Sequence, residues 1–119
     1  MQIFSPLARY KKYHLCITLD CSSGANRFLF LNSDDAYADT YSVSCDRVPC
    51  IPASDTGVTA FSFSMIPRYS DAQLSLYQAK KLGEIEKDVA AELLKFVHTV
   101  KSLAKKDKEL VRAAIAAMM

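Results

Sequence analysis

Hydrophobic and polar residues alternate along the first half of the chain and follow a helical period along the second half. Residues 13–19 place Tyr, Leu, Ile and Leu at every second position, the pattern of a strand with one buried face. Residues 27–32 form an apolar run suited to a central strand, and residues 58–66 form a β-branched and aromatic run that ends at Pro67. A further strand is expected around residues 41–45. The first half is therefore predicted to form a sheet.

Helical periodicity begins near Ser70, which with Asp71 resembles a helix start. Because Gly83 interrupts the pattern, we expect a short helix and then an extended piece at residues 82–85. The next helix, from Glu86, carries an apolar stripe formed by Val89, Leu93, Phe96, Val97, Val100 and Leu103. A last helix, capped by Asp107, carries a second stripe that we expect to pack on the core or on a second subunit: Leu110, Val111, Ala114, Ile115 and Met118.

Composition bounds the class of protein. The chain has 119 residues, half of them hydrophobic, which predicts one domain with a strand-rich part at 1–69 and a helical part at 70–119. The net charge of +2 divides into −1 for residues 1–71 and +3 for residues 72–119. This balance excludes a binder that relies on bulk positive charge, so any nucleic-acid site must be a local patch. With no membrane span or signal peptide, we expect a cytoplasmic protein that does not associate with membranes.

The cysteines allow more than one interpretation. Cys16, Cys21, Cys45 and Cys50 form two pairs with four intervening residues, which could place four thiolates around a zinc ion. Structural zinc sites more often use two intervening residues on a tight turn, and Cys16 lies within a predicted strand. Disulfides would need an oxidising compartment, so we favour free thiols. The three glycines are isolated, which argues against phosphate-cradling loops and hence against dinucleotide or ATP chemistry.

The two histidines differ in their surroundings. His98 lies on the flank of an apolar helical stripe, which favours a partly buried structural role. His14 is predicted to face away from the buried side of its strand and follows Lys11 and Lys12. Imidazole exchanges protons near neutral pH, so His14 is a candidate acid or base.

Cations and aromatic residues are mixed in the segment from Arg9 to Tyr13, which includes Lys11 and Lys12. Such a mixture can bind phosphates while stacking on unpaired bases. The alternative is that these residues are a solvated segment leading into the first long strand.

Two other pairs of residues are also candidates for a functional role. Arg68 and Tyr69 stand at the end of a predicted strand, where functional loops are common, although Arg68 could instead form a structural salt bridge. Asp34 and Asp35 are adjacent, so on an extended chain they point to opposite sides and are unsuited to act as a paired acid and base.

The order of elements in the second half resembles the end of the PemK/MazF toxin family. The resemblance rests on the run from Thr56 to Ile66, a loop, the segment Lys81–Ile85 and the amphipathic helix that follows. The first half is compatible, with an apolar strand from Phe28 to Leu31 and then Ser33.

The resemblance implies an α+β fold: a small, strongly bent antiparallel β-barrel of the SH3-like type, followed by C-terminal helices. It also implies a homodimer that cuts single-stranded RNA without a metal or cofactor, with a protein antitoxin as a possible partner. In this chemistry the 2′-hydroxyl attacks the neighbouring phosphate, which requires a base, an acid and cations.

The family's site carries over only in part. Lys12 or His14 would replace the arginine of an Arg-Pro pair, Ser33 matches a hydroxyl residue, and Ser64 stands where an acidic residue is common. The resulting candidates are His14, Ser33 and Arg68 for catalysis, and Arg9, Lys11, Lys12 and Tyr69 for RNA binding. The departures keep open a second hypothesis, a non-catalytic barrel module, encoded by a phage or mobile element, that binds a protein or RNA. A third hypothesis is a zinc-bound regulator that uses the four cysteines.

Overall fold

The computed structural model describes residues 2–4, 13–19, 26–32, 38–51, 55–77 and 79–119. Seven strands form one antiparallel sheet: β1 (Gln2–Phe4), β2 (Tyr13–Thr18), β3 (Asn26–Asn32), β4 (Thr40–Ser44), β5 (Val58–Ser62), β6 (Arg68–Tyr69) and β7 (Lys81–Glu84). The strand order is β4-β5-β3-β2-β1-β7, and β6 also pairs with β3. The helices are η1 (Cys45–Arg47, a 3₁₀ turn), α1 (Asp71–Leu76), α2 (Lys87–Val97) and α3 (Lys105–Ala116). The predicted α+β class is confirmed.

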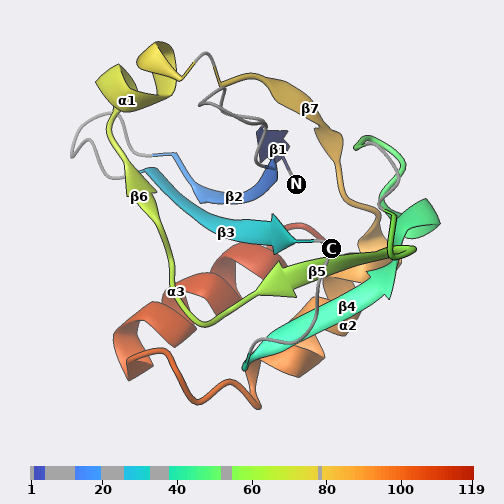
Figure 1. The fold of residues 1–119 in the computed structure, drawn as a ribbon. Coiled ribbons are helices and arrows are strands. Elements are labelled where there is room, and N and C mark those ends of the chain that lie inside the picture. The colour runs from blue at the N-terminus through green and yellow to red at the C-terminus, as the bar shows by residue number, and fades with distance from the viewer. Residues whose placement is uncertain (1, 5–12, 20–25, 33–37, 52–54, 78) are drawn as a thin grey trace.

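The sheet is strongly curved, and its two ends approach each other (Figure 1). A Cβ built on Gly83 of β7 would lie 2.6 Å from Cβ of Cys50, which follows η1, so this approach requires glycine. Among the described strands, however, no hydrogen-bonded pairing joins β4 to β7. The described strands therefore form an open sheet rather than a closed barrel.

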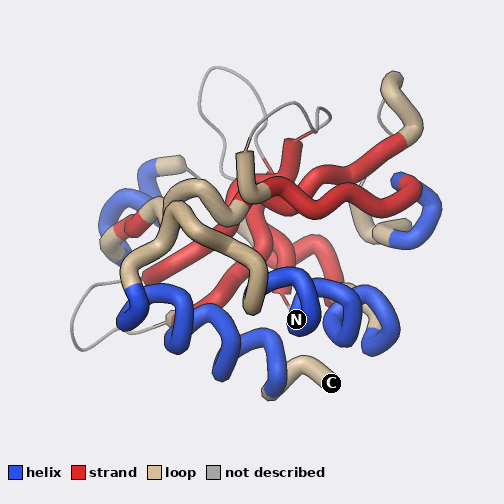
Figure 2. Tube along the Cα trace, turned by 90° about the horizontal axis from the view of Figure 1, so that it is seen from below, coloured by secondary structure: helices blue, strands red, loops and turns tan. Residues whose placement is uncertain are grey.

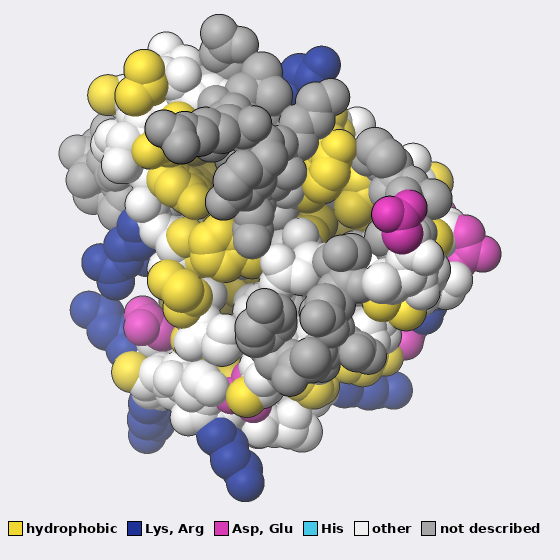
Figure 3. Space-filling view, viewed as in Figure 1, with side chains coloured by type: hydrophobic (Ala, Val, Ile, Leu, Met, Phe, Trp, Pro, Cys, Tyr) yellow, Lys and Arg dark blue, Asp and Glu magenta, His cyan; other side chains and the backbone are white. Residues whose placement is uncertain are grey.

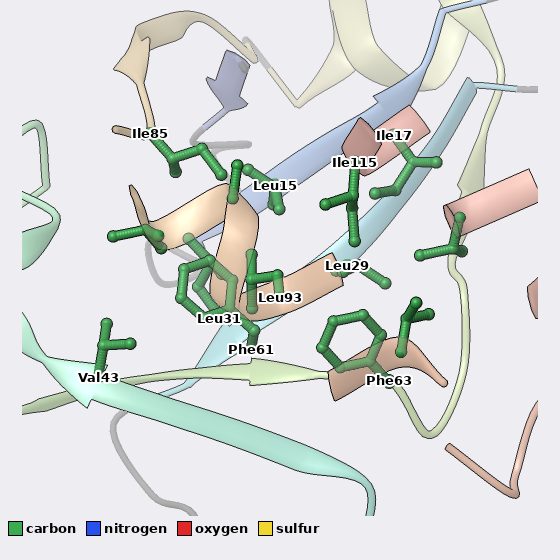
Figure 4. Packing of buried hydrophobic residues seen from close by; sticks show 14 of the residues in the cluster. Leu15, Ile17, Leu29, Leu31, Val43, Phe61, Phe63, Ile85, Leu93 and Ile115 are labelled. Carbon is green, nitrogen blue, oxygen red and sulfur yellow. The ribbon is translucent and has the colours of Figure 1, made fainter. Parts of the chain in front are cut away.

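Both long helices lie side by side along one side of the strands (Figure 2). The core between these layers consists of alternating strand residues and the helix stripes, and its fully buried members include Leu15, Leu29, Phe61, Phe63, Val89, Leu93, Val97, Val111 and Ile115 (Figure 4). Each such large side chain contributes about 1.5–3 kcal/mol through burial. In the part of the chain that the structure describes, no helix is long and apolar enough to cross a membrane.

The predicted helices were right in position and wrong in detail. α2 ends at Val97, so Val100 and Leu103 continue the buried stripe from the loop that follows. Asp107 does not cap α3, because the helix begins earlier, with Ala104 as its N-cap. The second stripe packs on the core, as expected, through buried Val111 and Ile115.

The strands also differ from the predicted pattern in two places. β5 ends at Ser62 instead of residue 66; Phe63 N still donates to the carbonyl oxygen of Asp39, next to the last pair of the β4–β5 ladder, and residues 63–66 belong to no strand. β2 is buried on both faces rather than one, and Leu19 lies beyond the strand and is half exposed. The reason is that aromatic side chains of β3 and β6 pack around His14 on the second face.

Candidate functional site

His14 of β2 and Tyr69 of β6 meet on the face of the sheet that lies opposite the long helices. Nε2 of His14 lies 3.2 Å from the hydroxyl oxygen of Tyr69, and either group can donate, depending on the imidazole tautomer. β3 separates their strands: Phe30 pairs with His14, and Asn26 pairs with Tyr69. The fold thus joins two residues that are 55 positions apart in the chain.

Aromatic rings surround this pair and form what we call the aromatic cluster: His14, Phe28, Phe30, Tyr69 and Tyr77. Ring centroids are 4.9 Å apart for His14 and Phe30, 5.6 Å for Phe28 and Tyr69, and 5.9 Å for Tyr69 and Tyr77. Tilted and edge-on ring pairs at these distances stabilise by about 0.5–1.5 kcal/mol each beyond their burial. Phe30, Tyr69 and Tyr77 are half-buried, so the cluster reaches the surface. Hydrophobic side chains are visible over α1 and the adjoining sheet (Figure 3).

Asn26 and the start of α1 fix the position of Tyr69. The buried Asn26 donates from Nδ2 to the carbonyl oxygen of Tyr69 at 2.9 Å and to Oδ1 of Asp71 at 2.8 Å. Ser70 accepts from the backbone N of Gln73 at 3.1 Å, and its own backbone N donates to the Gln73 side chain at 2.8 Å, a capping box. The backbone around Tyr69 is therefore held from both sides.

Burial raises the pKa of Tyr69 above its ordinary value, and the nearby Tyr77 adds to this effect. The phenol thus keeps its proton at neutral pH. His14 is only 1% exposed, so Tyr69 is the member of the pair that an external molecule can reach. Chemically, the pair can donate a hydrogen bond or pass a proton between the surface and a buried imidazole.

Of the predicted site residues, the structure brings two together, His14 and Tyr69. Arg68 is exposed and, because neighbouring strand residues point to opposite faces, it lies on the other side of β6 from Tyr69. The remaining candidates lie outside the described residues: Arg9, Lys11, Lys12 and Ser33.

The other sequence candidates have simpler surroundings. His98, predicted to be partly buried, is exposed, because α2 ends one residue before it. Cys16 is buried, Cys45 and Cys50 are half-buried, and all three are free thiols, as expected; Cys21 lies outside the described residues. No three His, Cys, Asp or Glu side chains gather as a metal site within the described ranges.

Sequence reasoning missed the residues that support the pair. Phe28 and Phe30 are predicted only as part of a central strand, and Asn26 precedes that strand without a predicted role. The signal for Asn26 is weak, because a buried amide is recognisable only once its two acceptors, both distant in the chain, are known.

Comparison with protein-family models, curated proteins and solved structures finds no match for this chain. Its function is therefore argued from the geometry of the His14–Tyr69 pair and its surroundings.

Proposed function

We propose that this protein is a divergent PemK/MazF-like endoribonuclease that cleaves single-stranded RNA without a metal ion. The observation that carries the proposal is the hydrogen-bonded pair of His14 and Tyr69. The sequence suggested His14 for proton exchange and Tyr69 for RNA contact, and the two residues belong to separate segments of the chain. Their proximity supports a joint role at one site.

In the proposed reaction, the 2′-hydroxyl of the RNA attacks the adjacent phosphorus. Its proton passes to the oxygen of Tyr69 while the Tyr69 proton passes to Nε2 of His14, so no phenolate accumulates. The 5′-oxygen leaves with a proton taken from water, and the hydroxide that remains recovers the proton from His14 through Tyr69. The products are a 2′,3′-cyclic phosphate and a 5′-hydroxyl. The raised pKa of Tyr69 suits this relay, because the phenol begins and ends the step protonated.

Substrate binding would use the aromatic cluster and the cations that the sequence places at residues 9–12. Half-buried Phe30 and Tyr77 offer ring faces on which unpaired bases can stack. Arg9, Lys11 and Lys12 would contact phosphates, and Ser33 would orient the scissile group. On this proposal the curved sheet completes an SH3-like barrel, and the protein acts in the cytoplasm as a homodimer controlled by a protein antitoxin.

A second candidate function is binding of single-stranded RNA without cleavage, in a non-catalytic barrel module. The specific observation that favours it is the burial of His14, which is 1% exposed. Arg68 also faces away from the pair, which leaves the described part of the site without a cation for the transition state.

Cleavage of an end-labelled, unstructured RNA in the presence of EDTA tests the proposal. We expect cleavage with 2′,3′-cyclic phosphate ends, and Tyr69→Phe should slow it about 100-fold or more, because the relay is lost. Tyr41→Phe is the matched control, because it removes a phenol hydroxyl that donates to Glu92 of α2, away from the proposed site, and it should leave the rate unchanged.

Fluorescence anisotropy with the same RNA separates the two functions. Binding without cleavage by the unmodified protein would support the second function. Cleavage at equal rates by the unmodified protein and Tyr69→Phe would show that another site acts. Absence of both cleavage and binding would contradict both proposals.

A further inference from the structure

Three polar residues form a row across the sheet on the face opposite the His14–Tyr69 pair. Thr18 of β2 is the cross-strand partner of Arg27 in β3, and Arg27 is the partner of Arg68 in β6. Directly paired residues share a face of the sheet. Arg27 alternates with the core residues Leu29 and Leu31, so the row lies on the side of the long helices.

A bulge in β2 brings Thr18 to this face. The pairing shifts between Cys16 and Thr18, so Ile17 is an extra residue, and Ile17 and Thr18 together oppose Arg27. Ile17 consequently packs in the core next to Ile115 of α3 (Figure 4). Thr18 stands beside it at the edge of that packing.

The described residues leave part of the row without hydrogen-bond or ion-pair partners. Within the described ranges, neither Arg27 nor Arg68 contacts a carboxylate, although their strands place the two cations directly opposite each other. Nε of Arg27 and the hydroxyl oxygen of Thr18 are both buried without a hydrogen-bond partner. Opposed like charges and buried unsatisfied polar atoms both cost free energy, and an oxyanion placed here would relieve both.

An apolar groove lies between the end of β2 and α3, and Thr18 is one of the residues that line it. Its volume is about 570 Å³, and its other lining residues are Cys16, Ile17, Leu19, Leu110, Ala113, Ala114, Ala117 and Met118. Burial raises the pKa of the Cys16 thiol to about 11, so this group adds no negative charge. The lining is aliphatic, with neither aromatic faces nor polar groups suited to reading a nucleobase.

We propose that the row and the groove together bind a phosphate monoester of an apolar chain. The two guanidinium groups and the Thr18 hydroxyl hold the phosphate, and the chain lies along α3 in the groove. Two cations favour a dianionic phosphate over a carboxylate. The proposal does not depend on the ribonuclease activity, because it concerns the opposite face of the sheet.

Isothermal titration calorimetry with decyl phosphate, below its micellar concentration, tests the site. Decyl phosphate should bind at least tenfold more tightly than inorganic phosphate or decanoate, and decyltrimethylammonium should not bind. Arg68→Gln changes an exposed side chain, so the fold is kept, and it should weaken binding at least tenfold. Ala117→Leu fills the groove from an exposed position. It should weaken the binding of decyl phosphate but not the binding of inorganic phosphate.

Arg112→Gln is the matched control, because it removes the same charge from α3 outside the groove lining and should leave binding unchanged. Thermal unfolding of each variant confirms that the fold is kept. Decyl phosphate that binds no more tightly than inorganic phosphate would overturn the role of the groove. Equal affinities for Arg68→Gln and Arg112→Gln would overturn the role of the row. If an RNA oligonucleotide binds through Arg68 while decyl phosphate does not, the row contacts nucleic acid and the proposal is wrong.

Discussion

Two half-buried arginines on the helix side of the sheet have opposite environments. Arg47, in η1, donates to Asp88 at 3.1 Å and forms a close pair with Glu92, which also accepts from the hydroxyl of Tyr41 at 2.6 Å. Arg27, in β3, contacts no carboxylate in the described part of the chain. The first arginine is satisfied by the protein itself and joins η1 and β4 to α2. The second has a buried Nε atom for which no described residue supplies a hydrogen-bond acceptor.

The different environments of Arg27 and Arg47 cannot be predicted from charge alone. The composition and net charge treat these arginines alike, and both stand in the half of the chain that is net negative. Their roles diverge because α2 presents two carboxylates to Arg47, whereas Arg27 meets another arginine and a hydroxyl across the ladder. An arginine with carboxylate partners is a structural link, and one without them is a candidate ligand site.

Loss of the apolar packing of α2, the helix that Arg47 contacts, should destabilise the protein most. Leu93→Ala removes a fully buried side chain on the helix that carries Asp88 and Glu92 and should lower the free energy of unfolding by about 3 kcal/mol. Urea denaturation measures this. The exposed Leu76→Ala on α1 is the control and should change stability by less than about 0.5 kcal/mol. A smaller loss for Leu93→Ala than for loss of the ion pair would mean that charge, and not packing, holds α2.

A direct test replaces each arginine by methionine, which keeps the apolar stem. Arg47→Met leaves Glu92 and Asp88 without their cation and should destabilise the protein. Arg27→Met removes an unsatisfied buried nitrogen and a repulsion, so we expect unfolding to cost the same or up to about 1 kcal/mol more. Arg47→Met should therefore lower the urea midpoint, whereas Arg27→Met should leave it unchanged or raise it. Equal destabilisation would show that Arg27 is as well satisfied as Arg47.

The sequence predicts the elements that depend on local periodicity and misses those that depend on distant partners. The strand around Leu15 and the helix with Leu93 follow from the spacing of their apolar residues, and the strand around Leu29 follows from its continuous apolar run. The burial of His14 does not follow, because it requires a two-residue strand, β6, contributed from more than fifty positions later. Alternation along β2 predicts that His14 faces solvent. In the structure, Tyr69 of β6 covers His14.

The candidate sites divide in the same way. His14 and Tyr69 were chosen from residue type, and only the tertiary fold shows that they are paired. Thr18 and Arg27 carried no signal, because strict alternation would have separated them, and the bulge at Ile17 places them on one face. Bulges depend on how two strands pair, so a single strand's pattern does not reveal them.

The smallest effect is the pH dependence of the pair formed by Arg47 and Glu92. Arg47 first, and Tyr41 second, lower the pKa of Glu92 to about 2. A carboxyl whose folded pKa is depressed stabilises the fold above its unfolded value of about 4.3, and the contribution is lost as pH falls toward 2. Glu92→Gln should therefore lower the melting temperature at pH 7 and bring it closer to that of the unmodified protein at pH 2. Because both side chains are about one third exposed, the difference at pH 7 should shrink in 1 M salt. A melting-temperature difference that stays constant from pH 7 to pH 2 would mean that the carboxylate charge of Glu92 does not stabilise this link.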